Sequence, residues 1–183
     1  ILIFLADYSK WYKYYEVNGV REFQKDRGET FAGPSAGSFV LAVQDAVIAA
    51  ENAVIAAESL GIGSCYIGDI MEQKEYHKTL FNLPEYVFPV AMLTLGYYPE
   101  DYMVPLKERF AEKYVVFEER YNELSKEDID DMFRKRDQLF TAKNKYNAKN
   151  YAQMHYNFKV KAPFSKEMQR SVEEALKEWD KKE

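Results

Sequence analysis

The sequence has few of the residues that several common site chemistries require. Its 183 residues include one cysteine and two histidines, so an internal disulfide is impossible and a zinc site is not expected. Serine-hydrolase chemistry and a phosphate-binding Gly/Lys loop are not expected either. The single cysteine, Cys65, is interpreted as a small strand residue. Because the chain cannot form an internal disulfide, it does not need an oxidising compartment. We therefore expect it in the reducing cytoplasm.

Positive charge is also scarce. Lys and Arg number 25 against 30 Asp and Glu, which gives a net charge of −5, whereas a protein that follows nucleic-acid phosphates is usually basic. No segment reads as a membrane span, because the apolar opening, residues 1–6, is far too short and lacks the basic flank of a secretory signal. We therefore expect neither a nucleic acid nor a membrane as partner. Since the chain opens inside a strand and not at a Met, we expect residues to be missing upstream.

Apolar and aromatic residues, by contrast, are abundant. Hydrophobic residues make up 47% of the chain and aromatic residues 16%, with 15 Tyr and 12 Phe. A chain of this length can bury about 70% of its unfolded surface, so it can form a core without disulfides. The aromatic content indicates more buried or subunit-facing surface than an average monomer has.

Short apolar runs alternate with helical periods in the first half of the chain, which predicts an α/β or α+β core. The longest helix is predicted over residues 38–60, where two adjacent apolar stripes indicate that most of its girth is buried. Gly61 follows it, where a left-handed C-terminal cap belongs. The further predicted elements are strands at 1–6, 63–68 and 87–95, a helix at 72–81, and a loop or short helix within 8–33.

After residue 105 the chain becomes charged and aromatic, without a further strand-like run. Ser125 and Asp128 form a plausible capping box, which predicts a helix through about residue 140. Ser165 is expected to cap a last helix that docks by one apolar stripe. This part of the chain is therefore expected to be helical.

Three segments follow one another in an informative order. Residues 52–70 contain the run ESLGIGSCYIG, residues 83–99 end in LGYYP, and Lys107-x-Arg109 comes next. In this order and spacing, residues 45–109 resemble the nitroreductase family of FMN-dependent oxidoreductases. Residues 110–183 resemble only loosely the C-terminal extension of some members.

The resemblance implies an α+β fold in which a mixed sheet is flanked by helices. It also implies an intertwined homodimer, with the helix at 38–60 central to the interface and FMN held there by both subunits. Residues 1–110 would form the flavin-binding core, without its N-terminal part. Residues 111–183 would form a helical C-terminal extension of the same domain.

The resemblance also assigns residues to the cofactor. The flavin-contacting block falls on Tyr66, Ile67, Gly68 and Asp69, and the phosphate-contacting pair falls on Lys107 and Arg109. A glycine lets the backbone approach a flat ring, and a backbone N–H there can donate to flavin N5. A Lys and an Arg two apart on an extended segment would point the same way and could clamp a phosphate.

The implied activity is hydride transfer from NAD(P)H through FMN to a nitroaromatic, a quinone or free flavin. No side chain is required as acid or base, so neither a catalytic side chain nor a metal ligand is expected. Two features depart from the family: its N-terminal Arg-Arg-Ser-like motif is absent, and Asp69 stands where many members have Gly. They leave two alternatives open, a flavin-binding module without useful turnover and a purely structural dimerising domain.

Overall fold

A computed structural model describes residues 1–103 and 106–180 of the chain. These residues divide into two compact units. The first comprises Ile1–Glu100 together with the C-terminal helix that begins at Pro163, and the second is Asp101–Ala162. The last helix therefore packs with the N-terminal residues. The sequence analysis had grouped this helix with residues 111–162 in one C-terminal extension.

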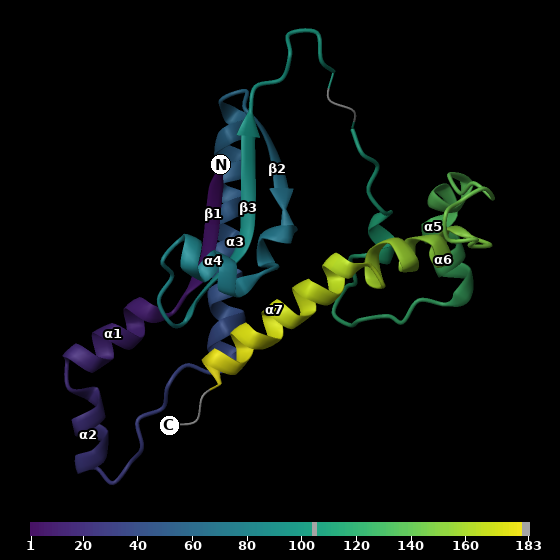
Figure 1. Cartoon of the computed structure of the whole chain (residues 1–183). Helices are drawn as coiled ribbons and strands as arrows, with labels where there is room; N and C mark the ends of the chain where they lie inside the picture. Colours follow the sequence, from purple (N-terminus) through teal and green to yellow (C-terminus); the bar gives the residue numbers. More distant parts are fainter. Residues whose placement is uncertain (104–105, 181–183) are drawn as a thin grey trace. The chain divides into compact units, whose positions relative to one another are not determined.

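A three-stranded sheet lies at the centre of the first unit (Figure 1). Its strands are β1 (Leu2–Asp7), β2 (Gly63–Ile67) and β3 (Val87–Gly96), in the order β1-β3-β2. The three predicted strands are thus confirmed, and so is the α+β class. The described strands pair only antiparallel, since β3 lies between β1 and β2 and runs antiparallel to both. A mixed sheet would also contain a parallel pair.

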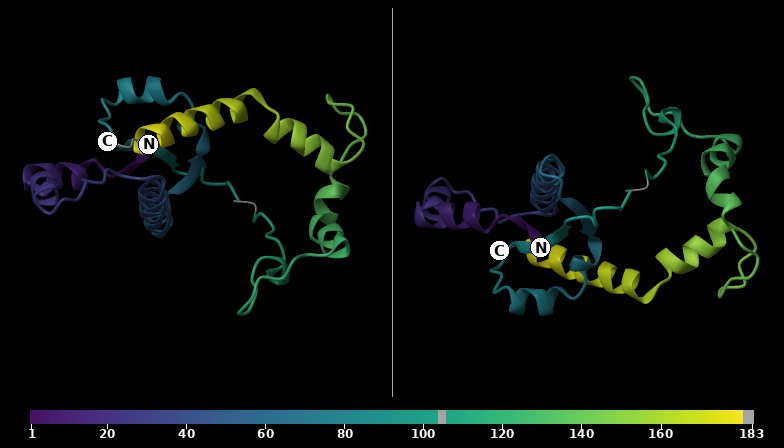
Figure 2. Two further views of the ribbon diagram at one scale, coloured as in Figure 1. Left: turned by 90° about the horizontal axis from the view of Figure 1, so that it is seen from below. Right: turned by 90° about the horizontal axis from the view of Figure 1, so that it is seen from above.

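Helices cover both faces of this sheet. Figure 2 shows α3 (Ala36–Ser59) on one face, with α4 (Lys74–Leu80) and α7 (Pro163–Trp179) on the other. Residues 87–91 of the central strand are consequently all buried. A continuous apolar run of this kind is typical of a strand with helices on both sides.

The long helix α3 forms where the sequence predicted it, with its start two residues earlier. Ser35 caps it, because the Ser38 N–H donates to Ser35 Oγ at 3.3 Å and the Ser35 N–H donates to Ser38 Oγ at 3.3 Å. Gly61, with a φ of 70°, ends the helical path as expected.

Within the part of the chain that the structure describes, one stripe of α3 is buried. Its buried residues are Phe39, Ala42, Ala46, Ala50 and Ala57, and the small alanines let the helix lie close to the sheet. Its exposed apolar residues are Val40, Leu41, Val47, Ile48 and Ile55. The length and apolar composition of α3 would also suit a membrane-spanning helix, which the sequence analysis did not predict. Because its alanines pack against the sheet, we interpret α3 as a core helix.

The remaining helices define two segments more closely and correct the expected Ser165 cap. Residues 8–33 form two helices, α1 (Ser9–Val17) and α2 (Val20–Asp26), and Gly19 at a φ of 70° separates them. Helix α7 begins at Pro163 and not at a Ser165 cap, since proline is well suited to the first position of a helix. Between β2 and α4 the chain makes a 3₁₀ turn, η1 (Gly68–Met71).

The second unit consists of short helices and loops. Helix α5 (Lys126–Gln138) has the predicted capping box, in which the Asp128 N–H donates to Ser125 Oγ at 3.2 Å and the Ser125 N–H donates to Asp128 Oδ2 at 3.0 Å. The other elements are the 3₁₀ turn η2 (Glu112–Tyr114), helix α6 (Tyr151–His155) and a π-helical turn, η3 (Tyr156–Val160).

The last helix ends inside the core of the first unit. Trp179 is 1% exposed, and its ring packs against Phe39 at 5.1 Å, Tyr8 at 6.1 Å and Tyr86 at 6.2 Å between centroids. Phe39 belongs to α3, so this cluster joins the C-terminus of α7 to the N-terminal part of α3.

The two tryptophans of the chain allow a matched test of this cluster. We expect Trp179→Ala to lower the free energy of unfolding by about 3–5 kcal/mol, the usual cost of removing a buried aromatic side chain. Trp11 is 57% exposed, so Trp11→Ala should cost much less. Denaturant titration followed by circular dichroism measures both. Equal losses for the two variants would show that α7 does not end in the core.

Candidate functional site

The chain leaves the sheet at the end of β2 and turns at once into η1. Four of the residues assigned to the cofactor, Tyr66 to Asp69, lie together across this junction. Ile67 pairs with Met92 of β3, and the side chain of Ile70 is buried and anchors η1. Gly68 and Asp69, between these two anchors, are exposed.

Neither the backbone conformation nor the packing of the chain explains why residue 68 is glycine. Its φ lies outside the left-handed region, and a Cβ added there would meet no described atom within 4 Å. Gly63 is different, because a Cβ there would lie 2.5 Å from the ring of Tyr98. The open space at Gly68 therefore suits a flat external group packed against bare backbone.

The side chains beside Gly68 differ in how firmly they are held. The Tyr66 hydroxyl donates to Glu51 Oε2 of α3 at 3.3 Å. Desolvation raises the pKa of Tyr66, and the adjacent Glu51 carboxylate raises it further, so the hydroxyl stays protonated at neutral pH. Asp69 makes no ion pair or side-chain hydrogen bond with any described residue, and its carbonyl accepts the Glu72 N–H at 3.0 Å. The carboxylate of Asp69 is therefore free to face a ligand or solvent.

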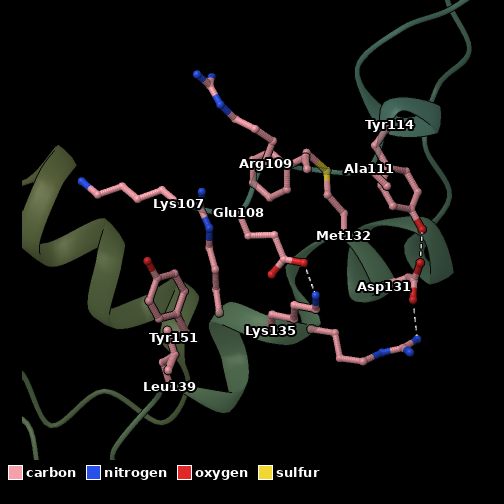
Figure 3. A pocket seen from close by; sticks show the side chains of 13 residues that line it. Lys107, Glu108, Arg109, Ala111, Tyr114, Asp131, Met132, Lys135, Leu139 and Tyr151 are labelled. Atoms are coloured by element: carbon pink, nitrogen blue, oxygen red, sulfur yellow. Dashed lines mark hydrogen bonds and ion pairs between the residues drawn. The ribbon is translucent and has the colours of Figure 1, made fainter. Parts of the chain in front are cut away.

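Lys107 and Arg109 lie in the second unit. They line a hollow of about 660 Å³ between the segment at residues 107–111 and α5 (Figure 3). Most other charges in this hollow are compensated. Lys135 pairs with Glu108, Arg134 pairs with Asp131 at 2.6 Å, and the Arg136 guanidinium lies 4.5 Å from the centre of the Phe110 ring.

Among the described residues, Lys107 and Arg109 have neither an ion pair nor a hydrogen bond, and unlike Arg136 neither lies over an aromatic ring. Both are exposed, and the segment that carries them has no regular secondary structure. Figure 3 shows the charged ends of the two side chains apart. Without a strand, successive side chains lack the two-residue alternation that would align them. Both side chains would have to turn to hold one phosphate.

The predicted site residues thus fall into two groups, Tyr66–Asp69 in the first unit and Lys107 with Arg109 in the second. The first group offers bare backbone and a tyrosine, which suit a planar ring such as a flavin. The second group offers two cations, which suit an anion such as a phosphate. The described residues contain no group of three His, Cys, Asp or Glu placed to hold a metal ion.

One motif escaped the sequence analysis. Residues 33–37 read Gly-Pro-Ser-Ala-Gly, which is the Gly-x-Ser-x-Gly pattern of a nucleophile elbow. A true elbow joins a strand to a helix, but residues 28–35 contain no strand. Ser35 serves as the N-cap of α3, as described above. The structure therefore explains this serine without assigning it any chemistry.

Comparisons with known proteins point in one direction. A model of the Nitroreductase family matches residues 3–97, slightly more than half of the chain. The curated "CR(VI) reductase" of Pseudomonas sp. (strain G-1) is 38% identical over 72 residues. That match covers 39% of this chain but only 30% of the relative's length.

Solved structures match over almost the whole chain. The NfrA2 protein of B. megaterium superposes with a TM-score of 0.72 at 28% identity, covering 99% of this chain and 69% of that one. An NADPH:FMN oxidoreductase from Vibrio harveyi, complexed with NAD+, gives a TM-score of 0.65 at 22% identity, covering 95% and 65%. These likenesses confirm the expected fold.

The difference in free space at Gly68 and at Gly63 can be tested without any ligand. Gly68→Ala should change the free energy of unfolding by no more than about 0.5 kcal/mol, because the added methyl group enters open space. Gly63→Ala should destabilise the chain by about 1 kcal/mol, because the ring of Tyr98 must move. Denaturant titrations of both variants decide. A Gly68→Ala loss as large as that of Gly63→Ala would mean that the space at Gly68 is filled by the chain itself.

Proposed function

This chain belongs to the nitroreductase family, and from that membership and the geometry of η1 we propose that it is an FMN-dependent NAD(P)H oxidoreductase. The observation that carries the proposal is Gly68, a glycine whose side-chain position is open and which lies where the family resemblance puts the flavin. Gly68 follows β2, which is an edge strand of the sheet, so a ring can lie against the backbone there. Family membership supplies the identity of that ring.

The residues of this chain would bind and orient the cofactor. The backbone from Ile67 to Asp69 would lie along the edge of the ring, and Lys107 with Arg109 would hold the phosphate. FMN, when bound, supplies the capacity to accept and donate hydride, which no amino-acid side chain has. A carboxylate near the ring disfavours extra negative charge there, so Asp69 would oppose an anionic reduced flavin. No side chain is assigned as acid, base or metal ligand.

The proposed co-substrate is NADH or NADPH, and the proposed acceptor is a nitroaromatic, a quinone or free flavin. The matched Vibrio harveyi protein, described as an NADPH:FMN oxidoreductase, supports the choice of both cofactor and co-substrate. The name of the Pseudomonas relative adds Cr(VI) to the acceptors worth testing. A cytoplasmic location is part of the same proposal, because the single cysteine is free and exposed.

The phosphate clamp gives the first test. We expect the double variant Lys107→Ala/Arg109→Ala to bind FMN about a hundredfold or more weakly, because each charge-assisted hydrogen bond contributes about 1.5–3 kcal/mol. The matched control is Lys25→Ala/Arg27→Ala, which removes the same residue types at the same spacing from α2 and its C-terminal end. Fluorescence titration with FMN measures all three affinities. If the clamp variant binds FMN as tightly as the parent, these residues do not hold the phosphate.

We further propose that the chain forms a homodimer through the exposed apolar side of α3. The support is the row of exposed Val, Leu and Ile residues on that helix, which within the first unit is covered only on the side facing the sheet. Contiguous apolar surface of this kind usually marks an interface. The sheet covers one side of α3, and a second copy of the chain would cover the exposed apolar residues on the other side.

Sedimentation equilibrium tests the dimer. We expect Val47→Asp to dissociate it, because an unpaired charge buried in an interface costs about 3–5 kcal/mol. Gln138→Glu, which adds the same charge to an exposed polar position on α5 and not on α3, should leave the dimer intact. A parent chain that sediments as a folded monomer at micromolar concentration would exclude this interface.

A further inference from the structure

Helix α4, which follows the turn that carries Gly68 and Asp69, begins without a side-chain cap of its own. After η1 the chain passes through Gln73 in the left-handed conformation, with φ 51° and ψ 49°, and α4 begins at Lys74. The side chain of Gln73 makes no capping hydrogen bond. The first amide groups of a helix have no partner inside that helix, so buried ones need partners from elsewhere.

Helix α7 supplies those partners from the far end of the chain. The Gln73 N–H donates to Glu167 Oε1 at 3.1 Å, and the Lys74 N–H donates to Ser171 Oγ at 3.0 Å. Ser171 is completely buried, and the main-chain group that it accepts from is buried with it. The residues that meet here are 94 and 97 positions apart in the sequence.

A second layer of contacts holds these two acceptors in place. Arg170 donates to Glu167 at 2.9 and 2.7 Å and to both carboxylate oxygens of Glu75 at 2.9 and 2.8 Å. Hydrogen bonding from Arg170 lowers the pKa of Glu75 to about 2 and lowers that of Glu167 as well. Both carboxylates are therefore charged at neutral pH. The buried Lys74 contacts the partly exposed Glu178 through Nζ and Oε1 at 2.6 Å, which adds an ion pair between α4 and α7.

We propose that Ser171 and Glu167 are positioning residues for the flavin, acting through the turn at residues 68–73. This rests on the proposed function. The turn is anchored at its start by the pairing of Ile67 with Met92 and at its end by α7. Asp69 has no side-chain partner among the described residues and Gly68 has no side chain, so the backbone at these two positions depends on the anchors on either side. Removal of the α7 acceptors would take away the hydrogen bonds at the end of the turn and leave the pairing of Ile67 and the buried Ile70.

The first experiment uses the chain without FMN. Hydrogen exchange should show the amides from residue 68 to residue 74 exchanging about tenfold faster or more in Ser171→Ala, because the Lys74 N–H loses its buried acceptor. The matched control is Trp179→Phe, which loosens the core about two turns further along the same helix but leaves both acceptors in place. That control should not accelerate exchange selectively at residues 68–74. Unchanged exchange in Ser171→Ala would overturn the inference.

The second experiment loads the chain with FMN and uses Glu167, which is partly exposed and whose variants should fold. Glu167→Ala should shift the midpoint potential of the bound flavin, whereas Glu167→Gln should restore the parent value because its amide oxygen can still accept the Gln73 N–H. A tenfold difference in affinity between the two redox states corresponds to about 30 mV for a two-electron couple. A merely structural role would move stability but not the potential.

The outcomes separate the two proposals. If the parent binds FMN and both Glu167 variants keep its potential and affinity, the positioning role is wrong and the proposed function stands. If the parent binds no FMN, the proposed function fails and the flavin role of these residues fails with it. A potential shift in Glu167→Ala that Glu167→Gln reverses, together with selective exchange in Ser171→Ala, supports the inference.

Discussion

The antiparallel pairing of β2 with β3 decides where this chain presents bare backbone. It places Ile67 opposite Met92, so that the next residues, Gly68 and Asp69, leave the sheet at a fixed point. A shift of one residue would send each side chain of β2 to the opposite face of the sheet and would move Gly68 away from this point. Helix α3 covers one face of the sheet and α7 the other, and α7 also holds the far end of the turn. The proposed site is thus a consequence of how the first unit is layered.

Much of this architecture can be read from local patterns. Helix α3 follows from its apolar period with a serine before it and Gly61 after it, and α5 follows from the Ser125–Asp128 capping box. Helices α1 and α2 could not be predicted in the same way, because they bury no residue. A helix without a buried stripe shows no apolar period for a sequence analysis to detect. The expected mixed sheet came from the family resemblance, whereas the described strands pair only antiparallel.

The site divides along the same line. Tyr66 to Asp69 are contiguous, so a short run of sequence was enough to single them out. The support from Ser171 and Glu167 arises only when the last helix folds back over α4, a contact across more than ninety residues that no local pattern encodes. The direction of the Lys107 and Arg109 side chains was also beyond prediction, because their segment has no strand geometry to set it. A contiguous set of candidate residues can be proposed from the sequence, whereas contacts between distant segments cannot.

The most direct test of the central claim is anaerobic reduction of the FMN-loaded chain by NADPH and by NADH, followed through the visible absorption band of oxidised flavin. The account predicts that the band bleaches in step with oxidation of the nicotinamide and returns when a quinone or a nitroaromatic is added. A chain that retains FMN but never bleaches would be a flavin-binding module and not an oxidoreductase. A chain that never retains FMN would leave only the structural dimerising domain and would contradict the account.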